Sequence, residues 1–101
     1  MNEGRPLIFI VDDVADNIQI AISHLQELDC DFAYALSGEQ ALTRIAVAKP
    51  QLILMDVMMP GLDGFDTVSR LRQNPYISSI PIIFLTARTE AEAVVRGFNL
   101  G

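Results

Sequence analysis

The chain has 101 residues, half of them hydrophobic, and a formal net charge of −6. This length fits a single domain over residues 1–101, and the acidic balance excludes direct binding to nucleic acid, whose phosphates attract Lys and Arg. No apolar run reaches the ~18 residues of a membrane span, and the first residues lack the order of a signal peptide. The single cysteine, Cys30, cannot form an internal disulfide, which indicates a reducing, cytoplasmic compartment.

The first half of the chain predicts two strand–helix units. A continuous apolar run over residues 7–11 is typical of a central strand buried on both faces. Apolar residues at helical spacing over 18–28 then predict a helix that has Ile20 on its opposite, exposed side. Residues 32–36 predict a second, short strand, and a capping box over 37–40 begins the next helix.

The second half repeats this alternation. Residues 52–55 are an apolar run that leads into Asp56, and prolines stand on either side, as expected of another buried strand. A helical pattern over 65–71 follows, then a strand over 82–85, and then a second capping box with a helix over 89–98. Four β–α units in succession predict an α/β fold with a parallel sheet, right-handed crossovers and helices on both faces.

Polar residues stand at the ends of three predicted strands: Asp12 and Asp13, Asp56, and Thr86 with Ala87. The carboxyl ends of parallel strands meet at one edge of a sheet, where α/β proteins place their chemistry. We therefore expect these residues, although distant in sequence, to converge on one crevice.

Carboxylates held this close require a cation or protonation, since a pair ~4 Å apart repels by about 4 kcal/mol at an effective dielectric constant of 20. Oxygen ligands alone select a hard ion, and a site that keeps several waters suits Mg²⁺. A carboxylate can attack phosphorus while the metal neutralises charge. The sequence therefore predicts a self-phosphorylating aspartate, with Asp56 as nucleophile and with the Thr86 hydroxyl and Ala87 amide binding a phosphoryl oxygen.

Several motifs in fixed order resemble those of a known family. They are FIVDD at 9–13, LMDVMMPGLDGF at 54–65, PIIFLTA at 81–87 and RGFNLG at 96–101. Over its whole length the chain is similar to the receiver domains of two-component response regulators. The resemblance implies a flavodoxin-like (CheY-like), doubly wound parallel sheet with strand order 2-1-3-4-5.

The resemblance also implies a role for each matching residue in a phosphorelay. Asp56 would accept a phosphoryl group from a phosphohistidine of a sensor histidine kinase or phosphotransfer protein. Asp13 and Asp56 would bind Mg²⁺ directly, Asp12 mainly through water, and the backbone carbonyl of Met58 would add a ligand. Thr86 would turn inward on phosphorylation and carry the signal. Such a domain catalyses its own phosphorylation and dephosphorylation but is not an enzyme for an outside substrate.

The family pattern continues past this sequence, to a fifth strand, a phosphate-binding Lys and a fifth helix. The single lysine here, Lys49, does not stand at a strand end, so the role of that Lys is carried onto no residue. We therefore expect a receiver domain truncated at its C-terminus, with four β–α units, weakened phosphotransfer and an uncovered apolar edge on its fourth strand. A homodimer through that edge is a further expectation.

Three other classes of function share part of this pattern. A flavin-binding electron carrier shares the fold, but the Asp12 and Asp13 pair would repel the flavin phosphate. A metal-dependent aspartyl phosphatase usually has an acid two residues after its nucleophile, where this chain has Met58. A third alternative, a phosphorylation-independent interaction or dimerisation module, stays open. The intact acidic residues argue against it for the parent protein, but the shortened C-terminal end makes it plausible for this chain.

Overall fold

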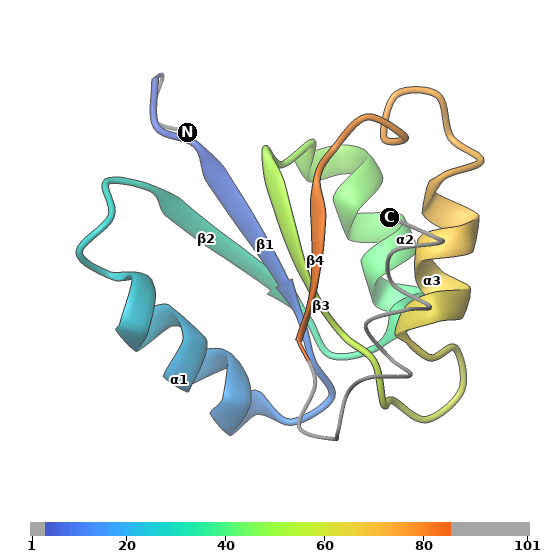
Figure 1. The fold of residues 1–101 in the computed structure, drawn as a ribbon, viewed down its shortest axis with the longest axis horizontal. Helices are drawn as coiled ribbons and strands as arrows, with labels where there is room; N and C mark the ends of the chain where they lie inside the picture. Colours follow the sequence, from blue (N-terminus) through green and yellow to red (C-terminus); the bar gives the residue numbers. More distant parts are fainter. Residues whose placement is uncertain (1–3, 86–101) are drawn as a thin grey trace.

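A computed structural model describes residues 4–85 of the chain (Figure 1). Its elements, in order, are β1 (Leu7–Val11), α1 (Ala15–Leu25), β2 (Asp31–Ala35), α2 (Gly38–Ala48), β3 (Leu52–Asp56), α3 (Gly64–Leu71) and β4 (Ile82–Leu85). The predicted alternation is confirmed as far as β4. The predicted fourth helix lies outside the described residues.

Within residues 4–85 the four strands form one sheet in the order β2-β1-β3-β4. All three strand pairs are parallel. The α1 helix packs on one face of the sheet, and α2 and α3 pack on the other (Figure 1). The α/β, flavodoxin-like fold is therefore confirmed, and so is the part of the predicted strand order that the four strands represent.

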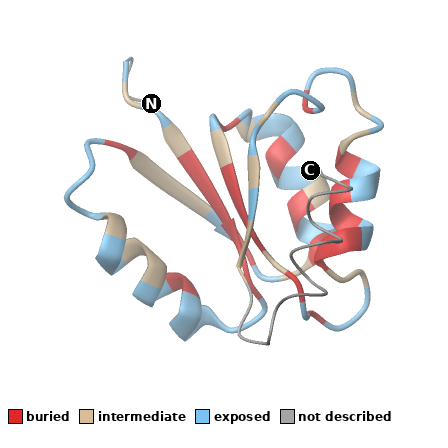
Figure 2. Cartoon of the chain, in the orientation of Figure 1, coloured by how far each residue is buried: buried red, intermediate tan, exposed pale blue. Residues whose placement is uncertain are grey.

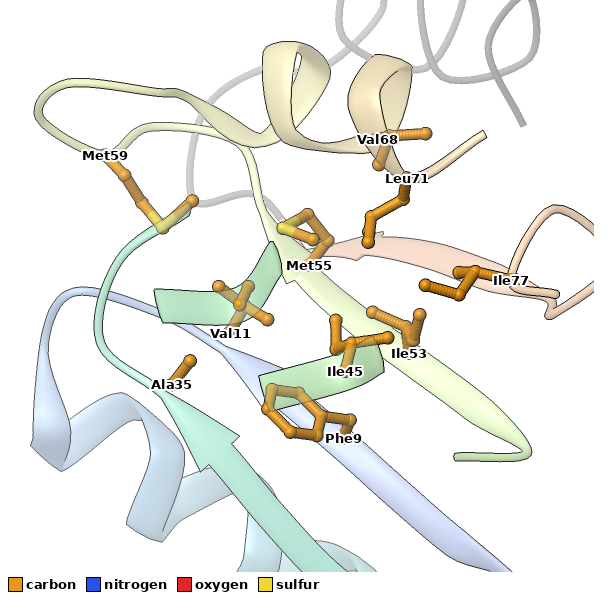
Figure 3. Packing of buried hydrophobic residues seen from close by; sticks show 11 residues of the cluster. Phe9, Val11, Ala35, Ile45, Ile53, Met55, Met59, Val68, Leu71 and Ile77 are labelled. Carbon is orange, nitrogen blue, oxygen red and sulfur yellow. The ribbon is translucent and has the colours of Figure 1, made fainter. Parts of the chain in front are cut away.

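The sheet separates two hydrophobic cores, which explains why β1 and β3 read as unbroken apolar runs (Figure 2). Side chains alternate across a strand, so Phe9 and Val11 of β1 enter the core under α2 and α3, whereas Ile8 and Ile10 enter the core under α1. The larger core has these fully or nearly buried members from the sheet, the helices and the loops between them (Figure 3): Phe9, Val11, Ala35, Ala41, Ile45, Ile53, Met55, Met59, Val68, Leu71 and Ile77.

The first helix is shorter than its apolar spacing predicted. It ends at Leu25, and Leu28, which the spacing placed on the buried face, is 53% exposed. The backbone leaves the helix through tight turns, in which the Leu28 N–H donates to Leu25 O and the Cys30 N–H donates to Leu28 O. No Gly or Pro announces this end in the sequence. The exposure predicted for Ile20 is confirmed at 54%.

The capping box at α2 is confirmed in a modified form. The Ser37 hydroxyl accepts a hydrogen bond from the Gln40 N–H at 3.0 Å. The Gln40 side chain reaches back one residue further than a capping box requires, and its Oε1 accepts from the Leu36 N–H at 3.0 Å. The helix ends at Ala48, before Pro50, with Lys49 in the left-handed conformation. Over the described residues, no helix has the length and apolar character needed to cross a bilayer.

Candidate functional site

The three predicted aspartates meet at the carboxyl ends of β1 and β3. These strands are parallel neighbours, with Val11 paired to Met55, so the next residues, Asp12 and Asp56, emerge side by side. One carboxylate oxygen from each of Asp12, Asp13 and Asp56 lies within 4.8 Å of the other two. We call this group the acidic cluster. The parallel register therefore brings together side chains that are more than forty positions apart in sequence.

Asp12 is the buried member of the acidic cluster, at 5% exposure. Its Oδ1 accepts hydrogen bonds from the Val14 N–H at 2.9 Å and from the Asn17 side-chain amide at 3.4 Å. Val14, the N-cap of α1, provides no side-chain cap itself, so Asp12 supplies an acceptor at the start of that helix. One carboxylate oxygen of Asp12 is thus held by the protein.

Asp56 has an electrostatic environment that opposes its charge. Burial, followed by the negative charge of Asp12, raises the pKa of Asp56 from 3.8 to about 6. The charge of Asp13 adds to this rise in pKa, while backbone hydrogen bonds from Met58 and Val57 lower it in part. The ionised carboxylate is therefore stabilised by whatever brings positive charge to the cluster.

The loop after β3 is held against the site by a close backbone approach. The Gly64 N–H, at the first residue of α3, donates to Val57 O at 2.9 Å. A Cβ added at Gly64 would overlap the backbone oxygen of Asp56. A glycine is required here because no side chain fits between α3 and the end of β3. The Met58 side chain is 55% exposed, so this residue presents its backbone to Asp56 and its side chain to solvent.

The end of β4 lies beside Asp56. Leu85 is the register partner of Asp56, and its carbonyl accepts a hydrogen bond from the Val57 N–H at 3.2 Å. Thr86 and Ala87 follow Leu85 directly in the sequence and lie outside the described residues. Lys49 caps the C-terminus of α2, two residues before Gln51, whose N–H donates to Leu7 O at the start of β1. It therefore stands near the amino ends of the strands, away from the acidic cluster.

Residues that sequence reasoning missed also shape the site. Asn17 lies in the first turn of α1, and its side-chain amide donates to the Asp12 carboxylate at 3.4 Å, a contact that the sequence did not indicate. The helical pattern over 65–71 did not single out Gly64, whose absent side chain lets α3 approach the end of β3. The Asp-Gly pair at 63–64 was the one available signal, and Asp63 does cap α3, since its Oδ1 accepts from the Asp66 N–H at 2.8 Å.

Residues 8–101 match the family described as the response regulator receiver domain. The chain belongs to this family. As a receiver domain it is 37% identical over 101 residues to the DNA-binding response regulator MtrA of Mycobacterium tuberculosis, covering 100% of this chain and 43% of MtrA. It is also 33% identical over 94 residues to the response regulator PleD of Caulobacter vibrioides, covering 93% of this chain and 21% of PleD. The receiver domain thus spans less than half of these relatives.

Solved structures of receiver proteins have the same fold. The chemotaxis protein CheY4 of Vibrio cholerae is 28% identical and superposes with a TM-score of 0.88, covering 97% of this chain and 82% of CheY4. The N-terminal domain of a response regulator receiver protein from Methanoculleus marisnigri is 31% identical, with a TM-score of 0.82 and coverage of 95% of this chain and 80% of that domain. The family resemblance seen in the sequence motifs is confirmed.

Proposed function

We propose that this receiver domain accepts a phosphoryl group on Asp56 and transmits a signal through a change of conformation. The observation that carries the proposal is the acidic cluster, in which a carboxylate with a pKa near 6 lies beside two others. A strongly perturbed carboxyl group with defined charged neighbours is typical of a functional site. The partly buried position of Asp56 leaves it open to an incoming phosphoryl group.

The residues present fit a hard divalent cation, and we propose Mg²⁺. The ligand atoms of the cluster are all oxygens, within 4.8 Å of one another, which suits Mg²⁺ rather than a softer metal. Asp13 and Asp56 would hold the ion directly, with the Met58 carbonyl as a further ligand. Asp12, whose Oδ1 already accepts two hydrogen bonds, would act through water. Bound Mg²⁺ supplies charge neutralisation and coordination positions for phosphoryl oxygens.

In the proposed reaction, a carboxylate oxygen of Asp56 attacks the phosphorus of a phosphohistidine. The P–O bond forms as the P–N bond breaks, and the imidazole of the donor leaves with the electron pair and is protonated. The donor is a sensor histidine kinase or a phosphotransfer protein. Water reverses the modification by cleaving the acyl phosphate. The domain thus contributes to its own phosphorylation and dephosphorylation and acts on no outside substrate.

The added charge of about −2 would be read by the segment that follows β4. Leu85 pairs with Asp56, so the next residues along the chain, Thr86 and Ala87, are the proposed ligands of a phosphoryl oxygen through a hydroxyl and a backbone amide. Inward movement of Thr86 would couple phosphorylation to β4 and the chain beyond it. A homodimer through β4 is also proposed, and the 52% exposure of Ile83 on this strand supports it. We also propose the cytoplasm as the compartment of the domain, residues 1–101.

The decisive experiment is intact mass spectrometry after incubation with acetyl phosphate, with and without Mg²⁺. We expect one phosphoryl addition that depends on Mg²⁺ and is absent in Asp56→Asn. Asp66→Asn, which changes an exposed carboxylate on α3, is the matched control and should be phosphorylated like the unaltered chain. No addition to the unaltered chain, or an equal addition to Asp56→Asn, would refute the proposal and favour an interaction module that works without phosphorylation.

A further inference from the structure

The outer edge of β2 carries backbone groups that do not face the sheet. Within residues 4–85, β2 pairs with β1 alone, and it is the outermost strand on its side (Figure 1). The Asp31 N–H donates to Pro6 O, and Ala35 O accepts from the Asp12 N–H, so these residues turn their backbone groups toward β1. Since the direction alternates along a strand, the backbone groups of Phe32 and Tyr34 point outward.

Helix α2 occupies only part of this edge. Arg44 Nη1 donates to Tyr34 O at 3.0 Å, and Gln40 Oε1 accepts from the Leu36 N–H at 3.0 Å. The N–H and C=O of Phe32 and the N–H of Tyr34 have no hydrogen-bonding partner within the described part of the chain. An edge of this kind is a template for another strand.

A groove runs beside these groups, between β2 and α2. Its volume is about 520 Å³, and its lining residues are Phe9, Phe32, Ala33, Tyr34, Thr43, Arg44, Val47 and Ala48. That volume falls in the usual range for ligand pockets. An apolar side chain of α2, Val47, is left 81% exposed at the groove. The groove therefore offers apolar surface that a side chain from outside the domain would cover.

Arg44 gives the groove its charge. It is the one charged residue in the lining, in a chain whose net charge is −6. A guanidinium has five N–H donors, of which Arg44 uses one on Tyr34 O. Both ion pairs found within residues 4–85 belong to Arg5, so no carboxylate of the described chain neutralises Arg44.

We propose that the groove between β2 and α2 binds an extended, acidic peptide segment of a partner protein, which adds as a strand to the free edge of β2. The peptide backbone would pair with Phe32 and with the Tyr34 N–H, as in other complexes formed by strand addition. One apolar side chain would cover Val47 in the groove, and a carboxylate would meet Arg44. A second copy of this chain fits less well, because it presents the same Arg44 at the same edge and the two guanidinium groups would face each other.

Nuclear magnetic resonance with two capped hexapeptides tests this proposal. In one probe Val and Glu alternate along one face of the strand, with Thr on the other face, and the second probe has Lys in place of Glu. Titrated into the ¹⁵N-labelled 101-residue chain, the Val–Glu probe should shift the amides of Phe32 and Tyr34 and slow their hydrogen exchange. It should bind at least about tenfold more tightly than the Val–Lys probe, the preference expected of one charge-assisted pair. Arg44→Gln should abolish that preference.

Arg70→Gln is the matched control, since Arg70 is an exposed arginine on α3, outside the groove. It should leave the tenfold preference and the shifted amides unchanged. The proposal is overturned if millimolar Val–Glu peptide leaves the β2 amides unshifted, if both probes bind equally, or if Arg44→Gln keeps the preference. Sedimentation equilibrium that reveals dimers with the Phe32 and Tyr34 amides protected in the absence of peptide would assign the edge to a second copy and overturn it as well.

Discussion

The two ends of the sheet hold acidic side chains in different company. At the amino-terminal end, the Arg5 guanidinium lies 2.7 Å from Asp29 and 3.1 Å from Asp31, and it also donates to Cys30 O. At the carboxyl-terminal end, the three carboxylates of the acidic cluster lie within 4.8 Å of one another, and no ion pair within residues 4–85 reaches them. The acids at the amino-terminal end are paired and stabilise the fold locally, whereas the acids at the carboxyl-terminal end repel one another and need a ligand to relieve that repulsion.

Close packing of α3 holds the end of β3 in place, so the largest loss of stability is expected from Gly64→Ala. The new Cβ would meet the backbone oxygen of Asp56, which cannot move without shifting β3. Overpacking of this kind costs about 2–3 kcal/mol of unfolding free energy, and we expect it to move Asp56 out of the cluster as well. Urea unfolding measures the first effect, and acetyl phosphate labelling of the folded fraction measures the second.

Ser69→Ala is the control for this change, because Ser69 is exposed on the same helix. It should stay within about 0.5 kcal/mol of the unaltered chain. Equal stability of Gly64→Ala and Ser69→Ala would show that α3 does not pack tightly on the end of β3. Close packing would then not explain how Asp56 is positioned.

Asp56→Asn is expected to raise the stability of the folded chain, by less than Gly64→Ala lowers it. Between pH 4 and 6 the folded chain keeps a proton on Asp56, whose pKa is about 6, while the unfolded chain, with a pKa of 3.8, has lost it. The native state then binds more protons, so this group makes stability fall as pH rises through that range. In EDTA at pH 7.5, Asp56→Asn should be more stable by about 1–2 kcal/mol, after allowance for solvent screening.

The gain from Asp56→Asn should nearly vanish at pH 3.5, where the carboxyl group is mostly protonated in both states. It should also shrink when Mg²⁺ is added at pH 7.5, because a cation bound to the native state stabilises the unaltered chain. Urea midpoints at the two pH values measure both trends. A gain that is the same at both pH values would mean that repulsion within the acidic cluster is not its cause.

The position of the acidic cluster could be predicted because apolar runs identify strands locally, and parallel pairing then determines which strand ends meet. Unbroken apolar runs over 7–11 and 52–55 placed β1 and β3 in the middle of a parallel sheet, and parallel pairing alone brings their last residues together. The end of α1 at Leu25 was not predicted, because apolar spacing continues to Leu28 while the chain has already turned. Here a tertiary preference decided the boundary.

Side-chain contacts that depend on how helices and loops pack against the sheet could not be predicted from the sequence. The hydrogen bonds of Arg5 join residues 24 to 26 positions apart, and nothing near Arg5 in the sequence indicates its partners. The approach of Gly64 to Asp56 and the contact of Arg44 with Tyr34 likewise depend on how helices pack against the sheet. The predicted roles of Thr86 and Ala87 stay predictions, since both residues lie outside the described range.

The smallest effect is expected at the amino-terminal end, from Arg5→Ala. Asp29 is largely exposed, with 89% of its side-chain surface in solvent, so its pair with Arg5 is screened by water and salt. The contacts with Asp31 and with Cys30 O are partly buried and carry most of the effect. We expect a loss of about 0.5–1 kcal/mol in urea unfolding at low salt, and less at high salt.

Arg70→Ala is the matched control for Arg5→Ala, since no hydrogen bond or ion pair of the Arg70 side chain is found within residues 4–85. Its stability should not change with salt relative to the unaltered chain. If the two ends of the sheet are independent, Arg5→Ala also leaves the Mg²⁺ affinity of the acidic cluster unchanged, because the charge it removes lies at the far end of β1, beyond effective screened range. A changed Mg²⁺ affinity in Arg5→Ala, measured by calorimetry, would mean that the paired acids and the acidic cluster form one electrostatic system rather than two.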